Sequence, residues 1–157
     1  MRSIAPIFSY VRVFFMVALL VGVAACARTP TEGAGGAATP GSQQEFLVTV
    51  GDRVFFETDS SILTNAGQTT LAAQATWLNR YSQYRIVIEG HADERGTREY
   101  NIALGARRAA ASVNFLVSRG VSANRITSKS FGKERPVAIC NDISCWSQNR
   151  RAVTVLN

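Results

Sequence analysis

The densest group of polar residues in the chain is the segment 89–97, which reads Glu-Gly-His-Ala-Asp-Glu-Arg-Gly-Thr. It follows a run of β-branched residues and precedes a helical pattern, so it lies at a strand-to-helix junction, where α/β folds commonly place ligand sites. Its glycines let the backbone approach a ligand closely. The following helix presents unpaired N–H groups and the positive end of its dipole, which favour a bound carboxylate. We therefore expect a binding site for a charged ligand here.

Two residues of opposite charge are the first candidates for ligand contacts. An unpaired Asp93 carboxylate can hold an ammonium group. Asn101 and Arg108 are seven residues apart, which at 100° per residue is within about 20° of two full turns, so they share a helix face with Leu104 between them. The Arg108 guanidinium can hold a carboxylate by two parallel hydrogen bonds. Together these charges suit a zwitterion such as an amino-acid head group.

The same charged residues also fit roles without a ligand. Asp93 can cap the helix or pair with Arg95 or Arg98. Arg108 can be a solvated surface charge. Both alternatives remain open at the level of the sequence.

Other side chains near this segment have competing roles. His91 is expected to form a hydrogen bond at the end of its strand rather than to act as a ligand or base. Phe55, Phe56 and Trp77 are expected in the core, the alternative being platforms on which sugars stack. Asp59 is a further candidate to line the pocket, although it is not among the expected site residues.

Hydrophobic periodicity indicates the elements that position these residues. The expected strands are 46–50, 53–56, 85–90, 126–131 and 151–156, and the expected helices are 64–81, a segment that Thr97 caps and that ends near 118, and a short piece at 146–149. The expected core stripe of the middle helix is Ile102, Ala106, Ala109, Val113, Leu116 and Val117. This order predicts an α+β fold, an α/β sandwich in which helices pack on one face of a mixed sheet.

The N-terminus has the pattern of a secretory signal peptide over residues 1–25. Arg2 and Arg12 precede an apolar run at 13–25, which ends in small residues. The run is shorter than the roughly 20 residues that cross a bilayer comfortably. A permanent membrane helix is the alternative.

Val-Ala-Ala-Cys at 23–26 is similar to a bacterial lipobox. This resemblance implies that Cys26 receives a diacylglycerol, that the chain is cut before it, and that the new amino terminus is acylated, for instance by palmitate. Two or three acyl chains give stable anchoring. Ala27, in place of Asp, favours the outer membrane by the same resemblance. Ordinary cleavage at Ala25-Cys26-Ala27, releasing a soluble protein, is the alternative.

Residues 26–44 are expected to form a flexible linker after the lipidated cysteine. Gly, Ala, Thr and Pro dominate this stretch, and it contains no large apolar residue with which to offset the entropy of ordering. One folded domain is expected over residues 45–157, a length typical of a single domain.

Two further cysteines, Cys140 and Cys145, lie near the C-terminus of an exported chain. An oxidising compartment favours a disulfide between them, with free thiols as the alternative. The chain has a single histidine, His91, which excludes a site built from several histidines. We expect neither a metal nor a cofactor.

The run Gly-His-Ala-Asp-Glu-Arg-Gly-Thr at 90–97, followed by Glu-Tyr-Asn-x-x-Leu-Gly-x-x-Arg-Ala at 99–109, closely resembles the signature of OmpA-like peptidoglycan-binding domains, in the version found in their lipoprotein members. The resemblance covers roughly residues 46–157. It implies that the ligand is diaminopimelate of uncrosslinked wall peptides, with the ammonium at Asp93 and the carboxylate at Arg108. The other expected ligand-binding residues are Asn101, Leu104 and Thr97. At Gly105, many relatives have Ser.

The same resemblance implies a cellular role. The protein is expected to be an outer-membrane lipoprotein whose domain lies in the periplasm, tethering that membrane to peptidoglycan. TolB and TolA of the Tol-Pal system, which acts in envelope integrity and cell division, are the expected protein partners.

Two other function classes fit the residues less well. A periplasmic cell-wall hydrolase could use Glu89, His91, Asp93 and Glu94, but neighbouring arginines keep such acids ionised and no Gly-x-Ser-x-Gly motif is present. The net charge of +6 suits any polyanion. Export argues against nucleic acid as a partner, and no basic run interleaved with aromatic residues occurs.

Overall fold

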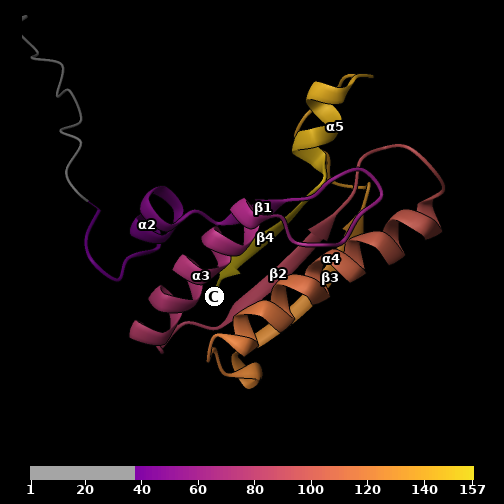
Figure 1. Cartoon of the computed structure of the whole chain (residues 1–157). Helices are drawn as coiled ribbons and strands as arrows, with labels where there is room; N and C mark the ends of the chain where they lie inside the picture. Colours follow the sequence, from indigo (N-terminus) through magenta and orange to yellow (C-terminus); the bar gives the residue numbers. More distant parts are fainter. Residues whose placement is uncertain (1–37) are drawn as a thin grey trace, which may run out of the picture. The chain divides into compact units, whose positions relative to one another are not determined.

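The structure is a computed structural model, which describes residues 38–157 (Figure 1). The expected signal peptide, Cys26 and the linker up to residue 37 lie outside the described residues. Within residues 38–157, no helix is long and apolar enough to cross a membrane.

A four-stranded sheet with the order β1-β4-β2-β3 forms the centre of the domain. Strand β4 is antiparallel to both β1 and β2, whereas β2 and β3 run parallel. Helices α3 and α4 pack on the same face of this sheet (Figure 1), which confirms the predicted α+β sandwich. The elements are α2 (Gln43–Glu45), η2 (Phe46–Val50), β1 (Arg53–Phe55), α3 (Asn65–Arg80), β2 (Ile86–His91), α4 (Arg98–Ser118), η3 (Ala123–Arg125), β3 (Ile126–Gly132), α5 (Ile143–Asn149) and β4 (Arg151–Leu156).

The two long helices begin where their capping residues predict. The side chain of Thr64 accepts a hydrogen bond from the Gly67 N–H at the start of α3, and that of Thr97 accepts one from the Tyr100 N–H at the start of α4. Apolar side chains between these helices and the sheet form the core. Its members include Phe46, Val54, Phe56, Leu71, Leu78, Ile86, Ile88, Ala109, Leu116 and Leu156.

The segment 46–50 is a helical turn, so the predicted strand there is wrong. Phe46 is buried against Trp77, with ring centroids 5.0 Å apart, and the Glu45 carboxylate accepts a hydrogen bond from Trp77 Nε1 at 2.7 Å. Val48, which shares the predicted inner face, is 70% exposed. This apolar segment therefore buries the ring of Phe46 and not the alternating side chains of a strand.

The folded domain begins before residue 45, the predicted boundary. The Tyr84 hydroxyl donates a hydrogen bond to the Gly41 carbonyl at 2.7 Å, and the Gly41 N–H donates to the Glu45 carboxylate at the same distance. Ser42 caps the turn that starts α2. The last residues of the expected linker are therefore attached to the domain.

The buried face of α4 is rotated relative to the predicted stripe. Ala106 and Val117 are exposed, whereas the buried residues are Asn101, Leu104, Gly105, Arg108, Ala109, Ser112 and Leu116. Close packing of α4 on the sheet explains the rotation. A Cβ on Gly105 would lie 2.4 Å from Ser130 Oγ and 2.9 Å from the Gly90 carbonyl oxygen, so this glycine serves helix–sheet packing and does not line the pocket.

Candidate ligand-binding site

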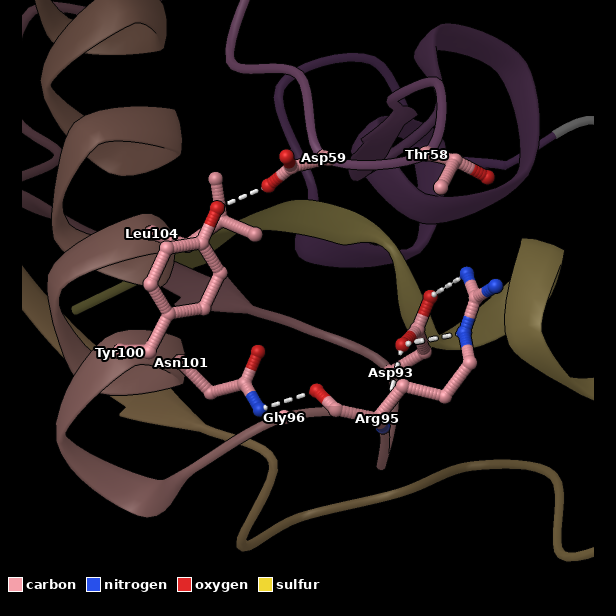
Figure 2. Close-up of a pocket in the computed structure, with 8 residues that line it drawn as sticks. All are labelled: Thr58, Asp59, Asp93, Arg95, Gly96, Tyr100, Asn101 and Leu104. Atoms are coloured by element: carbon pink, nitrogen blue, oxygen red, sulfur yellow. Dashed lines mark hydrogen bonds and ion pairs between the residues drawn. The ribbon is translucent and has the colours of Figure 1, made fainter.

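A pocket of about 220 Å³ lies where β2 ends and α4 begins (Figure 2). Three of the expected site residues line it, namely Asp93, Asn101 and Leu104. The other lining residues are Thr58, Asp59, Arg95, Gly96 and Tyr100. Thr97 lies outside the lining and caps α4. The strand-to-helix junction thus forms one wall, and the loop after β1 forms the other.

Asp93 is paired, so the unpaired carboxylate expected from the sequence is wrong. Its Oδ2 lies 2.7 Å from Arg95 Nη2, and its Oδ1 accepts from the Arg95 backbone N–H and from Nε (Figure 2). Arg150 Nη1 approaches the same Oδ2 at 3.4 Å. Burial raises the pKa of Asp93, but the bonds from Arg95 and Arg150 outweigh it, so the pKa lies below the ordinary 3.8. The carboxylate is therefore charged at neutral pH.

Arg108 is buried and does not line the pocket, contrary to the expected contact across it. Its Nε donates to the Ser60 carbonyl at 2.8 Å, its Nη1 to the His91 carbonyl at 2.8 Å, and its Nη2 to the Glu57 carbonyl at 3.1 Å. Burial lowers its pKa to about 10, although attraction to Asp93 opposes that shift. Arg108 therefore remains charged and joins the loop after β1 to the end of β2, which are the two walls of the pocket.

Tyr100 and Asp59 close the opposite side of the pocket. The Tyr100 hydroxyl donates a hydrogen bond to the Asp59 carboxylate (Figure 2). Asp59 has a φ of 56°, an uncommon conformation for a residue other than glycine, and it turns the loop after β1. The lining therefore carries two carboxylates, Asp59 and Asp93, and one guanidinium, Arg95. This charge set suits a zwitterion, and Arg95 rather than Arg108 supplies the guanidinium of the lining.

The loop between β2 and α4 is held from three elements. Asn101 Nδ2 donates to the Arg95 carbonyl at 2.7 Å from α4. Lys133 Nζ, just after β3, donates to the carbonyls of Glu94 and Gly96 at 3.0 and 2.6 Å. Trp146 Nε1, on α5, donates to Glu94 Oε1 at 2.5 Å, and the Arg95 guanidinium lies 4.2 Å from the centroid of a Trp146 ring. These contacts preorganise the loop.

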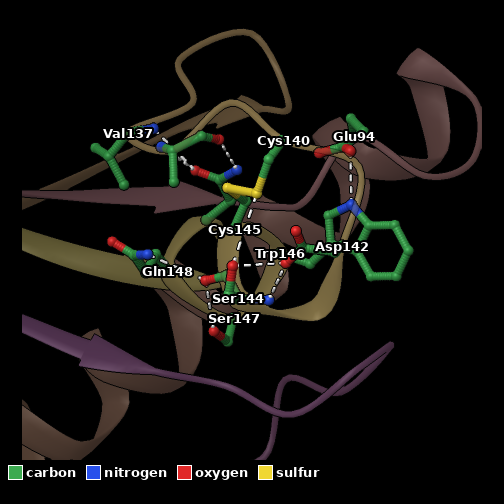
Figure 3. Close-up of a disulfide and its surroundings, with 11 residues drawn as sticks. Glu94, Val137, Cys140, Asp142, Ser144, Cys145, Trp146, Ser147 and Gln148 are labelled. Carbon is green, nitrogen blue, oxygen red and sulfur yellow. Dashed lines mark hydrogen bonds between the residues drawn. A yellow bond between two sulfur atoms is a disulfide. The ribbon is translucent and has the colours of Figure 1, made fainter.

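A disulfide joins Cys140 to Cys145 at the start of α5 (Figure 3), with the two Cα atoms 5.6 Å apart. The side chain of Asp142 caps the helix by accepting from the Ser144 N–H. Cys145 directly precedes Trp146, so the disulfide restrains the residue that contacts the pocket loop.

The His91 imidazole is buried and neither of its nitrogens has a hydrogen-bond partner among the described residues, so the hydrogen bond expected of this side chain at the strand end is wrong. Its ring stacks on Phe131 with centroids 5.5 Å apart. Burial lowers its pKa to about 4, with smaller contributions from Arg151 and Arg135. The imidazole is therefore neutral at pH 7. Among residues 38–157, no three His, Cys, Asp or Glu side chains gather as a metal site would require.

Two of the three aromatic residues expected in the core lie there. Phe56 and Trp77 are buried in the core, as expected. Phe55 is 47% exposed, so its expected core position is wrong. It is the last residue of the edge strand β1, and its side chain points away from the buried face that Val54 occupies.

Comparison with known proteins gives consistent matches. The OmpA family matches residues 55–150. The peptidoglycan-associated lipoprotein of Mesorhizobium japonicum is 62% identical over 152 residues, covering 90% of each chain, and that of Rhizobium meliloti is 62% identical over 146 residues, covering 90% of this chain and 83% of the relative. The crystal structure of the peptidoglycan-associated lipoprotein from Burkholderia pseudomallei matches with a TM-score of 0.66 and 42% identity, covering 68% of this chain and 90% of that one. The C-terminal domain of Helicobacter pylori MotB shares the fold at 20% identity, with a TM-score of 0.63 and coverage of 68% and 84%.

Proposed function

Because the chain belongs to the OmpA family, and within it to the peptidoglycan-associated lipoproteins, we propose that it binds peptidoglycan non-covalently through the diaminopimelate of a wall peptide. It is a non-enzymatic protein. Its cellular role is to tether the outer membrane to the wall, and TolB and TolA of the Tol-Pal system are its partners. Resemblance to the family supports the Tol partnership.

The observation that carries this proposal is the charge set of the pocket. Diaminopimelate presents an ammonium and a carboxylate on one carbon atom. Asp59 and Asp93 offer negative charge to the ammonium, and Arg95 offers a guanidinium that can hold the carboxylate by paired hydrogen bonds. Leu104 offers an apolar contact for the methylene chain. Arg108 keeps both walls in place and adds positive charge behind them.

The environment of the acids gives no support to the rival hydrolase. A general acid needs a raised pKa, whereas the pKa of Asp93 is lowered. Glu94 is engaged with Trp146, and His91 is buried and stacked on Phe131. Glu89 Oε2 lies 3.7 Å from His91 Nε2, beyond hydrogen-bond distance.

The attachment of the linker supports a tethering role. Gly41 is bound to Tyr84, which precedes β2, whereas the pocket follows the end of β2. The chain that leads back toward Cys26 thus leaves the domain at the opposite end of this strand. A lipid anchor at Cys26 and a wall peptide in the pocket would pull on opposite ends.

Sedimentation with insoluble peptidoglycan tests the proposal. Asp93→Asn keeps the side-chain shape and removes its charge, so we expect affinity to fall by about tenfold or more, because a hydrogen bond to a charged group contributes about 1.5–3 kcal/mol. Asp52→Asn is the matched control, since Asp52 pairs with Arg53 away from the pocket. Equal sedimentation of both variants and the wild type would contradict the assigned site.

A further inference from the structure

A second hollow of about 490 Å³ lies beside the pocket. Its lining includes Phe55, Glu57 and Thr64 on one side and Ser147, Gln148 and Arg150 on the other. The two hollows share a wall. Arg150 lines the second, and its Nη1 lies 3.4 Å from the Asp93 carboxylate that lines the first. Likewise Glu57 faces the second hollow, and the next residue, Thr58, faces the first.

An exposed aromatic ring is the main apolar surface of this hollow. Phe55 is 47% exposed, whereas its neighbours Val54 and Phe56 are 2% and 3% exposed. The described residues leave about half of this side chain uncovered, although a phenylalanine gains free energy from burial. A half-exposed aromatic ring in a concave wall is suited to a ligand with a flat apolar face.

Polar groups with unused hydrogen-bonding capacity surround the ring. Gln148 Nε2 donates to the Ser144 carbonyl, which leaves the amide oxygen free to accept. The Thr64 hydroxyl accepts from the Gly67 N–H and retains its own proton for donation. Glu57 offers a carboxylate at the rim. An aromatic face bordered by hydrogen-bond donors and acceptors, both neutral and charged, matches a sugar ring, whose C–H groups lie on its faces and whose polar groups lie at its edge.

We propose that this hollow is a subsite for an N-acetylated amino sugar of the same wall polymer. The inference rests on the proposed function, because the sugar is the one that carries the wall peptide bound at Asp93. In that polymer a few residues of peptide, about 3.3–3.6 Å each when extended, separate the sugar from the diaminopimelate, and the contact between Arg150 and Asp93 makes the two hollows neighbours. The sugar ring stacks on Phe55, and Gln148 and Thr64 bond to its edge.

Calorimetric titration of the full chain with two ligands tests this subsite. One ligand is a diaminopimelate-containing stem peptide, and the other is the same peptide attached to its N-acetylmuramyl sugar. We expect the wild type to bind the sugar-bearing ligand about tenfold more tightly, equivalent to about 1.4 kcal/mol. Phe55→Ala removes this difference and leaves the affinity for the sugar-free peptide unchanged. Phe55→Trp retains it.

Controls separate this inference from the proposed function. Val117→Ala, which truncates an apolar residue 40% exposed near the end of α4, keeps the preference for sugar. Equal affinities of the wild type for the two ligands would overturn the subsite while leaving the peptide site intact. A Phe55→Ala variant that weakens both ligands alike would also overturn it. Failure of the wild type to bind either ligand would overturn the proposed function together with the subsite.

Discussion

Arg95 covers the carboxylate of Asp93, with Nη2 2.7 Å from Oδ2, while the same guanidinium lies 4.2 Å from the centroid of a Trp146 ring. A ligand ammonium that binds Asp93 must share or replace this partner. The Trp146 face gives the guanidinium a second attraction, because a cation over an aromatic ring is stabilised. The Arg95 guanidinium therefore has a contact with Trp146 that does not depend on Asp93.

Removal of Arg95 should raise the pKa of Asp93. Hydrogen bonds from Arg95 help to hold that pKa below 3.8, so we expect Asp93 in Arg95→Ala to take up its proton at a higher pH than in the wild type. An NMR titration of the carboxyl carbon measures this directly. Arg98→Ala is the control, since Arg98 pairs with Glu134 instead. Titration of Asp93 at the same pH in all three proteins would show that Arg95 does not set its pKa.

Replacement of Arg108 should destabilise the domain. Its guanidinium binds three carbonyls, of which that of His91 is in a buried hydrogen bond, and a buried polar group left unpaired costs about 1–3 kcal/mol, so we expect Arg108→Ala to lose at least this much unfolding free energy. Urea denaturation measures the loss. Arg107→Ala changes an exposed neighbour and should unfold close to the wild type. Equal urea midpoints for the two variants would contradict a structural role of Arg108.

Burial of neutral His91 should make stability depend on pH. Its pKa falls from 6.5 to about 4 on folding, so the unfolded chain binds this proton first as the pH drops. The stability is fully present above about pH 6.5 and is lost progressively toward pH 4, by on the order of 3 kcal/mol. Unfolding at several pH values in this window should show a shallower decline for His91→Phe. Parallel declines in the variant and the wild type would argue against this assignment.

Reduction of the disulfide should loosen the region around α5. Cys140 and Cys145 close a loop with a sequence separation of 5, for which the chain-entropy model gives about 2 kcal/mol of stabilisation. We expect a reductant to lower the unfolding free energy of the wild type by about this amount. The variant with both Cys140→Ser and Cys145→Ser should be insensitive to the reductant. A wild type that is equally insensitive would show that the bridge adds no stability.

Replacement of Cys26 should release the protein from the membrane. If Cys26 carries the lipid, Cys26→Ser moves the protein from the membrane fraction to the soluble fraction, because the acyl chains that provide anchoring are gone. The double variant of Cys140 and Cys145 should remain in the membrane fraction. Mass spectrometry of the wild type is the decisive measurement, since an unmodified mature N-terminus would rule out the anchor.

Local signals were sufficient to predict most of the elements and three of the eight residues that line the pocket. Thr97 caps its helix as expected, and Thr64, at the predicted start of the other long helix, caps that one, because a cap depends on residues three positions away. Asp93, Asn101 and Leu104 line the pocket because the strand end and the helix start that carry them are adjacent in the chain. Family resemblance added the class of ligand, which these spacings alone leave at the level of a zwitterion.

Tertiary structure decided which residues meet across the sheet. Asp93 meets Arg150 across a sequence separation of 57, and Tyr100 meets Asp59 across 41. Gly105 packs closely against Gly90, and this contact sets which face of α4 lies on the sheet. Arg108 is on that face, so it is buried behind the pocket and not exposed in it. Hydrophobic periodicity predicts only which face of a single helix or strand a side chain lies on. The contacts named above depend on how the strands are paired and how the helices pack on them. The sequence determined which charges were available, and the packing of the elements determined which of them face the ligand.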